Sequence, residues 1–291
     1  MSRSPRLHNG FTLVELLVSI AILMLVLVMV GQIISSASLV TNAGYKRMDA
    51  DSQARQILDR MSIDFSRMVK RSDADFFYQH NSNGNDQIAF YSETTGYYPS
   101  STGTNEKSGA CVVGYMIATN TNNNQPQLLR LSKGLPWNGV NNSTSMVYGT
   151  NSSPGNVLTT TWQNLKDGSD TDYQVIGNQV YRLAFAFLKK DGTITNASPN
   201  TTVLPQNISA VIVALAILDK TSRKIVTDPS KMVSALPDVA LSGTYNNSTQ
   251  LMAKTWNTAI NSSGFATTCG IPQSAASQVR VYQRFFYLNP Q

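Results

Sequence analysis

The longest hydrophobic stretch of the chain lies near its start. From Phe11 to Val30 almost every residue is apolar, and the polar exceptions are Thr12, Glu15 and Ser19. A helix of twenty residues is about 30 Å long, which matches the thickness of the hydrocarbon core of a bilayer. The pattern therefore predicts a transmembrane helix over residues 11–34.

A short polar segment, residues 1–10, precedes this helix. It contains Arg3 and Arg6 and no acidic residue. Because positive charge is retained on the cytoplasmic side of a membrane, we expect this leader in the cytoplasm and the rest of the chain on the other side. An ordinary secretory signal fits less well, since its hydrophobic region has roughly 7–15 residues and ends at a small-residue cleavage site.

Glu15 is the unusual residue of the apolar stretch. A carboxylate in a bilayer is costly, so such a residue faces the inside of an assembly or finds a partner of opposite charge. Alternatively, it lies at the membrane interface and extends into the headgroup region. The residues alone leave both interpretations open.

Helical periodicity continues after the apolar stretch, over residues 35–71. No proline occurs between Arg6 and Tyr98, so we expect one helix of roughly 60 residues, about 90 Å long, with Gly31 and Gly44 as places for a bend. Apolar residues recur with a period of 3.6 at Ala50, Ala54, Ile57, Leu58, Met61, Phe65, Met68 and Val69. The predicted polar face consists of Asp51, Arg55, Asp59, Arg60, Asp64 and Arg67.

The pattern changes to short strands over residues 72–291. Runs of β-branched and aromatic residues alternate there with turn residues. The predicted strands are Gln87–Ser92, Cys111–Thr119, Gln127–Ser132, Gln179–Lys189, Thr193–Asn196, Asn207–Asp219 and Val279–Leu288; the predicted helices are Pro229–Leu236 and Ser248–Ile260. We expect an α+β fold in which the amphipathic half of the N-terminal helix packs on an antiparallel β-sheet.

Composition and motifs exclude several classes of function. The net charge is +6, but no dense run of Lys and Arg follows the leader, so nucleic-acid binding through a basic patch is not expected. No phosphate-binding loop, dinucleotide-binding glycine pattern or zinc spacing is present. The two histidines, His8 and His80, offer no Ser-His-Asp set. We therefore expect no enzymatic activity and no cofactor.

Two further patterns concern a possible disulfide and a possible calcium site, and the sequence alone does not establish either. Cys111 and Cys269 could form a disulfide outside the cytoplasm or remain buried thiols, because sequence separation does not give the distance between them. Asp167, Asp170 and Asp172 lie close together in the segment DGSDTD and are candidate Ca²⁺ ligands. The segment lacks the downstream glutamate of an EF-hand, which favours a solvated loop.

The junction between the leader and the helix resembles a known motif. The sequence GFTLVELLVSIAIL, from Gly10 to Leu23, closely resembles the class III signal of type IV pilins and pseudopilins. The resemblance implies that a prepilin peptidase cleaves after Gly10 and N-methylates Phe11. It also implies that Glu15, the fifth residue of the mature chain, pairs in a filament with the terminal amine of a neighbouring subunit. Such a pair would compensate two charges that are individually expensive in a low-dielectric core.

Later segments extend the resemblance. QLLRLSK, YRLAFAFLKKDG and LPQNISAVIVALAI look like successive strands of the J-type minor pseudopilins of type II secretion. The chain is also similar to the C-type pilin-like cassette proteins of Verrucomicrobia. Residues 138–156 and 221–278 depart from the pseudopilin pattern, which leaves the particular machine open.

Two functions follow from these observations. The first is a structural subunit of a membrane-anchored filament in a secretion or pilus system. Its partners would be a prepilin peptidase, other pilin or pseudopilin subunits and an inner-membrane assembly platform. The second is a surface protein that binds a glycan or DNA through aromatic residues such as Tyr97, Tyr98 or Trp137. Both imply a single-pass protein of the bacterial inner membrane, with a cytoplasmic leader and a periplasmic or extracellular globular domain.

Overall fold

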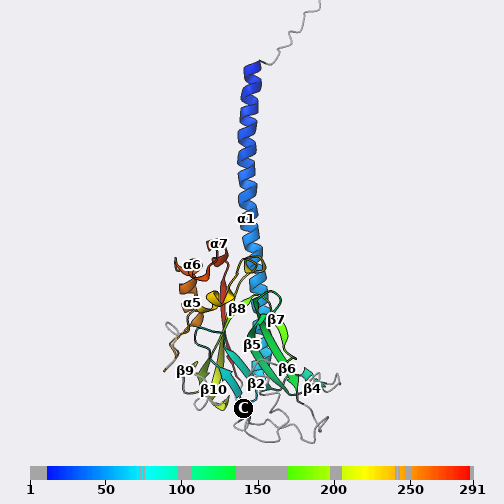
Figure 1. Ribbon diagram of the computed structural model, residues 1–291, viewed down its shortest axis with the longest axis vertical. Helices are drawn as coiled ribbons and strands as arrows, with labels where there is room; N and C mark the ends of the chain where they lie inside the picture. The colour runs from blue at the N-terminus through cyan, green and yellow to red at the C-terminus, as the bar shows by residue number, and fades with distance from the viewer. Residues whose placement is uncertain are drawn as a thin grey trace, which may run out of the picture. The chain divides into compact units, whose positions relative to one another are not determined.

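The computed structural model describes residues 12–71, 74, 76–97, 107–135, 170–196, 205–239, 241, 243–246 and 251–288. The chain divides into two compact units, Met1–Met48 and Asp49–Gln291. The long helix α1, Leu13–Ser66, contributes residues to both units (Figure 1). Gly31 and Gly44 lie inside α1, so neither glycine ends the helix.

The helix of the first unit is apolar on all sides. Every large hydrophobic side chain from Leu13 to Ile34 is exposed in the isolated chain. Within the described part of the chain, α1 is the helix that is long and apolar enough to cross a membrane. A helix suits that environment because its backbone hydrogen bonds are satisfied internally.

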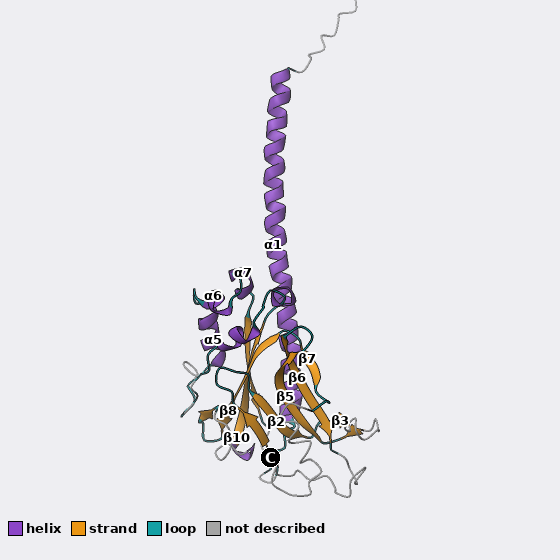
Figure 2. Ribbon diagram, in the orientation of Figure 1, coloured by secondary structure: helices purple, strands orange, loops and turns teal. Residues whose placement is uncertain are grey.

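The second unit contains two β-sheets (Figure 2). Sheet A has the strand order β1-β2-β5-β6-β3-β4, and β7 also pairs with β6; sheet B has the order β11-β10-β8-β9. The strands of sheet A are β1 Phe76–Gln79, β2 Gln87–Ser92, β3 Gly96–Tyr97, β4 Lys107–Ser108, β5 Cys111–Asn120, β6 Gln125–Gly134 and β7 Gln174–Gly177. Those of sheet B are β8 Val180–Lys189, β9 Ile194–Thr195, β10 Ile208–Ile217 and β11 Arg280–Tyr287. All pairings in the two sheets are antiparallel except that of β3 with β6.

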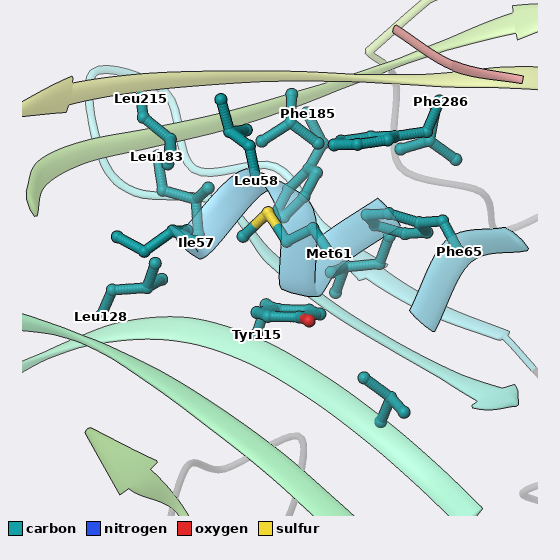
Figure 3. Packing of buried hydrophobic residues seen from close by; sticks show 14 of the residues in the cluster. Ile57, Leu58, Met61, Phe65, Tyr115, Leu128, Leu183, Phe185, Leu215 and Phe286 are labelled. Atoms are coloured by element: carbon teal, nitrogen blue, oxygen red, sulfur yellow. The ribbon is translucent and has the colours of Figure 1, made fainter. Parts of the chain in front are cut away.

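The central core holds the second half of α1 between the two sheets. Figure 3 shows Leu183, Phe185, Leu215 and Phe286 of sheet B on one side of the helix, and Tyr115 and Leu128 of sheet A on the other. The helix contributes Ala50, Ala54, Ile57, Leu58, Met61 and Phe65. Full burial of each large apolar side chain stabilises the fold by about 1.5–3 kcal/mol, so this double contact is the main attachment of α1 within the second unit.

The central strands of sheet B, β8 and β10, are buried on both faces. Along β8, Leu183 and Phe185 point into the core around α1, whereas Ala184 and Ala186 belong to a second cluster with Trp256. Short helices contribute further residues to that cluster: α4 Pro229–Ser234, α5 Met252–Ile260, α6 Phe265–Cys269 and α7 Gln273–Ala276. The remaining helical segments are η2 Pro205–Asn207 and α3 Lys220–Arg223. Burial on both faces explains why β8 and β10 are almost continuously apolar instead of alternating.

The expected α+β class is confirmed, with a long helix followed by antiparallel sheets. The predicted strands correspond to β2, β5, β6, β8, β9, β10 and β11, and the predicted helices correspond to α4 and α5. The structure has two sheets where we expected one, because α1 buries apolar side chains on two sides and needs an apolar surface against each. The sequence patterns do not predict the strands β1, β3, β4 and β7 or the helical segments η2, α3, α6 and α7.

Candidate functional site

The start of α1 contains the candidate assembly residue, Glu15. Its side chain is exposed, and Oε2 accepts hydrogen bonds from the backbone N–H and the hydroxyl of Thr12, both at 3.0 Å. In return, the N–H of Glu15 donates to Oγ1 of Thr12 at 3.3 Å. This reciprocal arrangement is a capping box, which provides partners for N–H groups that the first turn of a helix leaves unsatisfied.

The capping box gives Glu15 partners inside its own helix. Ser19, the third polar residue of the apolar stretch, also bonds locally, because its hydroxyl donates to the carbonyl of Glu15 at 2.7 Å. Thr12, Glu15 and Ser19 are therefore all hydrogen-bonded within the first turns of α1. The Thr-x-x-Glu spacing is the sequence signal for this cap, and hydrophobic periodicity does not reveal it. Gly10 and Phe11 lie outside the described residues, so the cleavage site stays a prediction.

A second polar site lies inside the core and corrects the expectation that Asp64 faces solvent. Asp64 is fully buried. Arg130 of β6 donates from Nε to Oδ2 at 2.7 Å and from Nη2 to Oδ1 at 2.9 Å. The Tyr115 hydroxyl of β5 also donates to this carboxylate, and Ser92 of β2 donates to the Asp64 carbonyl at 3.0 Å. A polar position on the helix is buried here because sheet A supplies its counter-ion.

The surroundings of Asp64 keep both of its side-chain partners in their donor forms. Burial disfavours the charged form of Arg130, but its hydrogen bonds and attraction to Asp64 hold its pKa above the usual value. Burial, reinforced by the charge of Asp64, raises the pKa of Tyr115 well above its usual value. Because the contacts come from β2, β5 and β6, the cluster links α1 to three neighbouring strands of sheet A.

The two cysteines form no disulfide. Cys111 and Cys269 are both free and buried, the first in the core around α1 and the second in the cluster beneath the short helices. Sheet B contributes to both clusters through its opposite faces, which keeps the two sulfur atoms apart. Burial raises the pKa of the Cys111 thiol, and it raises that of Cys269 to about 11. The structure therefore favours the alternative of two neutral buried thiols.

In the described part of the candidate calcium loop, a lysine side chain lies against the aspartates. Nζ of Lys133 lies 2.5 Å from Oδ2 of Asp170 and 3.0 Å from Oδ2 of Asp172. This ammonium group takes the place next to the carboxylates that a cation would need. No group of three or more His, Cys, Asp or Glu residues suited to a metal occurs among the described residues. Asp167 lies outside them, so calcium binding stays a prediction that the Lys133 contacts disfavour.

Comparison with known proteins concerns mainly the N-terminus. The model of the prokaryotic N-terminal methylation motif matches residues 5–31, which include Gly10, Phe11 and Glu15. The N-terminus of the chain therefore carries the prokaryotic N-terminal methylation motif. A comparison with curated proteins finds no significant match.

Among solved structures, the chain is similar to a type IV-like pilin from Thermus thermophilus. The two share 9% sequence identity over 83% of this chain and 95% of the other, with a TM-score of 0.34. A similarity this low does not establish a shared fold for the second unit. The fold of that unit rests on its own sheets and core.

Proposed function

We propose that this protein is a minor pseudopilin or minor pilin, a structural subunit of a membrane-anchored filament. The observation that carries the proposal is the methylation motif at residues 5–31, which leads directly into the apolar start of α1. The motif supplies the processing site for a prepilin peptidase. The helix supplies the anchor, and its exposed apolar surface becomes the packing surface once subunits leave the lipid.

The first step is insertion and processing. The leader with Arg3 and Arg6 stays in the cytoplasm, and the second unit is placed in the periplasm or outside the cell. Cleavage after Gly10 then creates a cationic amine on Phe11, which the peptidase methylates. Throughout this step the Thr12–Glu15 capping box gives the carboxylate two hydrogen-bond partners, so the apolar span tolerates an acid.

The second step is packing in the filament. Both hydrogen bonds from Thr12 go to Oε2 of Glu15, and the described residues place no donor at Oε1. A neighbour's Phe11 amine at Oε1 would complete the carboxylate and neutralise two charges in a core without water. The capping box thus holds Glu15 in a partly satisfied state that a second subunit completes.

A more specific proposal is a J-type minor pseudopilin of type II secretion, acting in protein transport with other subunits and an inner-membrane assembly platform. It rests on sequence resemblance in three segments, residues 127–133, 181–192 and 204–217. In the structure these segments contain most of β6, β8 and β10. They form buried strands around α1, so the resembling segments belong to the core of the second unit.

The deciding experiment compares Glu15→Ala and Glu15→Gln in cells that contain the assembly machine. Glutamine also fits a capping box, so Glu15→Gln keeps the helix start but removes the charge. Mass spectrometry should find both variants cleaved after Gly10 and methylated on Phe11. Co-purification with the filament should fall roughly a hundredfold for both, because a neighbour's amine is left buried without a partner.

The controls separate assembly from processing. A chain that retains residues 1–10 in the presence of a prepilin peptidase contradicts the processing step. If Glu15→Gln assembles like the wild type while Glu15→Ala does not, Glu15 acts only as a helix cap. If both variants assemble normally, the helix is an anchor, and the alternative of a surface binding protein gains support.

A further inference from the structure

The turn between β1 and β2, residues 80–86, covers part of the edge of sheet B. Asp86 is 1% exposed, and its Oδ2 accepts a hydrogen bond from the N–H of Phe185 at 2.8 Å. Oδ1 of Asn85 accepts another from the N–H of Leu183 at 2.9 Å. The N–H of Asp86 donates to the Leu183 carbonyl at 3.0 Å. The turn therefore occupies hydrogen-bonding positions along β8 that a neighbouring strand would otherwise take.

His80 lies in this turn between two carboxylates. Its Nδ1 is 2.9 Å from Oδ1 of Asp86, and its Nε2 is 3.7 Å from Oδ2 of Asp238. The side chain is 20% exposed, so a proton can exchange with solvent. Oδ2 of Asp238 also accepts a hydrogen bond from the N–H of Asn83 at 2.6 Å. The segment 237–239 thus meets the turn at two points, Asn83 and His80.

The other side of Asp238 faces the cluster beneath the short helices. Its Oδ1 pairs with Arg182, whose side chain is fully buried and lies 5.6 Å from the centre of the Trp256 ring. Nε1 of Trp256 donates to the Pro237 carbonyl at 2.9 Å. The segment 237–239 is therefore attached to sheet B by Arg182, which is always charged. It is attached to the turn by His80, which can gain or lose a proton.

The charged and titratable groups that face His80 are Asp86, Asp238, Arg182 and the hydroxyl of Tyr78, which lies 3.1 Å from Oδ2 of Asp86. A neutral imidazole has one N–H and can donate to only one carboxylate, whereas the protonated ring can donate toward both. We propose that the protonation state of His80 controls how firmly the turn is held. The protonated ring bridges Asp86 and Asp238 and connects the turn to segment 237–239, and loss of the proton weakens this connection.

The direction of the pH dependence follows from the same contacts. The hydrogen bond with Asp86 raises the pKa of His80 above its usual value, against the opposing effect of burial. The charges of Asp86 and Asp238 raise it further, and Arg182 lowers it. A raised folded-state pKa stabilises the protein fully below the unfolded value of about 6.5, and this contribution is lost as the pH rises through the folded-state value. The contact between the turn and segment 237–239 is therefore more stable in a mildly acidic medium.

The test uses the full-length protein in detergent micelles. NMR follows the His80 ring, assigned by its absence in His80→Gln, from roughly pH 5.5 to 8.5. Hydrogen exchange of the Asn83 and Phe185 amides is measured over the same range and corrected for the intrinsic effect of pH. We expect His80 to titrate above the usual histidine value. Protection of both amides should fall as the pH rises, by about tenfold for each unit of pKa elevation.

His80→Gln should remove this pH dependence, because the glutamine side chain does not titrate in this pH range. Asp228→Asn is the matched control: it removes one acid from the N-cap of α4, where asparagine caps a helix equally well, and should leave the pH dependence unchanged. A His80 ring that titrates like an exposed histidine overturns the proposal, as does an unchanged pH profile in His80→Gln. If His80→Gln does not fold, the wild-type titration decides alone, with the ring assigned by sequential NMR.

Discussion

Breaking the buried Asp64–Arg130 pair should destabilise the second unit strongly. In Arg130→Met, the fully buried Asp64 loses both hydrogen bonds from the guanidinium. The nearest remaining cation is Arg60, 3.6 Å from Oδ1 and 41% exposed. Removing one partner of a buried pair costs about 3–5 kcal/mol, and Arg60 should place the cost near the lower end. In a domain of this size, each kcal/mol lowers the melting temperature by about 2–4 °C, so we expect a drop of roughly 10 °C.

The chain offers a matched control for this variant. Arg284 of β11 also pairs with an aspartate of α1, Asp59, at 2.6 Å, but the two side chains are 43% and 57% exposed. A surface pair of this kind contributes about 0–1 kcal/mol. Arg284→Met should therefore shift the melting temperature by only a few degrees. The assay is thermal unfolding of the full-length protein in micelles, followed by circular dichroism in the far ultraviolet.

Removing the whole cluster distinguishes a charge effect from a packing effect. The triple variant Asp64→Leu, Arg130→Met and Tyr115→Phe deletes the acid, the cation and the hydroxyl that bonds to it. Apolar replacement of a complete buried ion pair is often neutral or stabilising, so the variant should recover most of the loss. Melting of Arg130→Met within about 2 °C of Arg284→Met would show that the burial of Asp64 adds no cost, since each kcal/mol shifts the melting temperature by about 2–4 °C.

Two further predictions concern the edge of sheet A and the cysteines. A Cβ on Gly96 would lie 2.5 Å from Cβ of Cys111 and 2.8 Å from the Gly134 nitrogen, so Gly96→Ala should cost about 1–3 kcal/mol in a urea titration. Gly109→Ala has open space and should be near neutral; equal effects would contradict the packing argument. At neutral pH, a thiol reagent should label neither Cys111 nor Cys269 until the protein unfolds, as read by intact mass, because both thiols are buried and neutral. A peptide that joins the two cysteines would disprove this.

Local patterns in the sequence determined the long N-terminal helix and the longer strands. The apolar stretch, the period of 3.6 beyond it and the β-branched runs depend on residues within a few positions of one another. That is why β2 has the predicted bounds, Gln87–Ser92, and why α1 ends at Ser66, near the predicted end of the helical pattern. The Thr12–Glu15 cap is equally local, since its partners lie three positions apart along the chain.

The tertiary structure alone decided which charges are buried and which side chains meet. Asp64 occupies a polar position of the helical pattern, yet it is buried because Arg130, 66 residues away, reaches it from sheet A. His80 acquires a second carboxylate only because the fold brings Asp238 beside it. The periodicity of one segment reports its own polarity but carries no information about the surface packed against it. A buried charge is tolerated only where that surface supplies its counterpart.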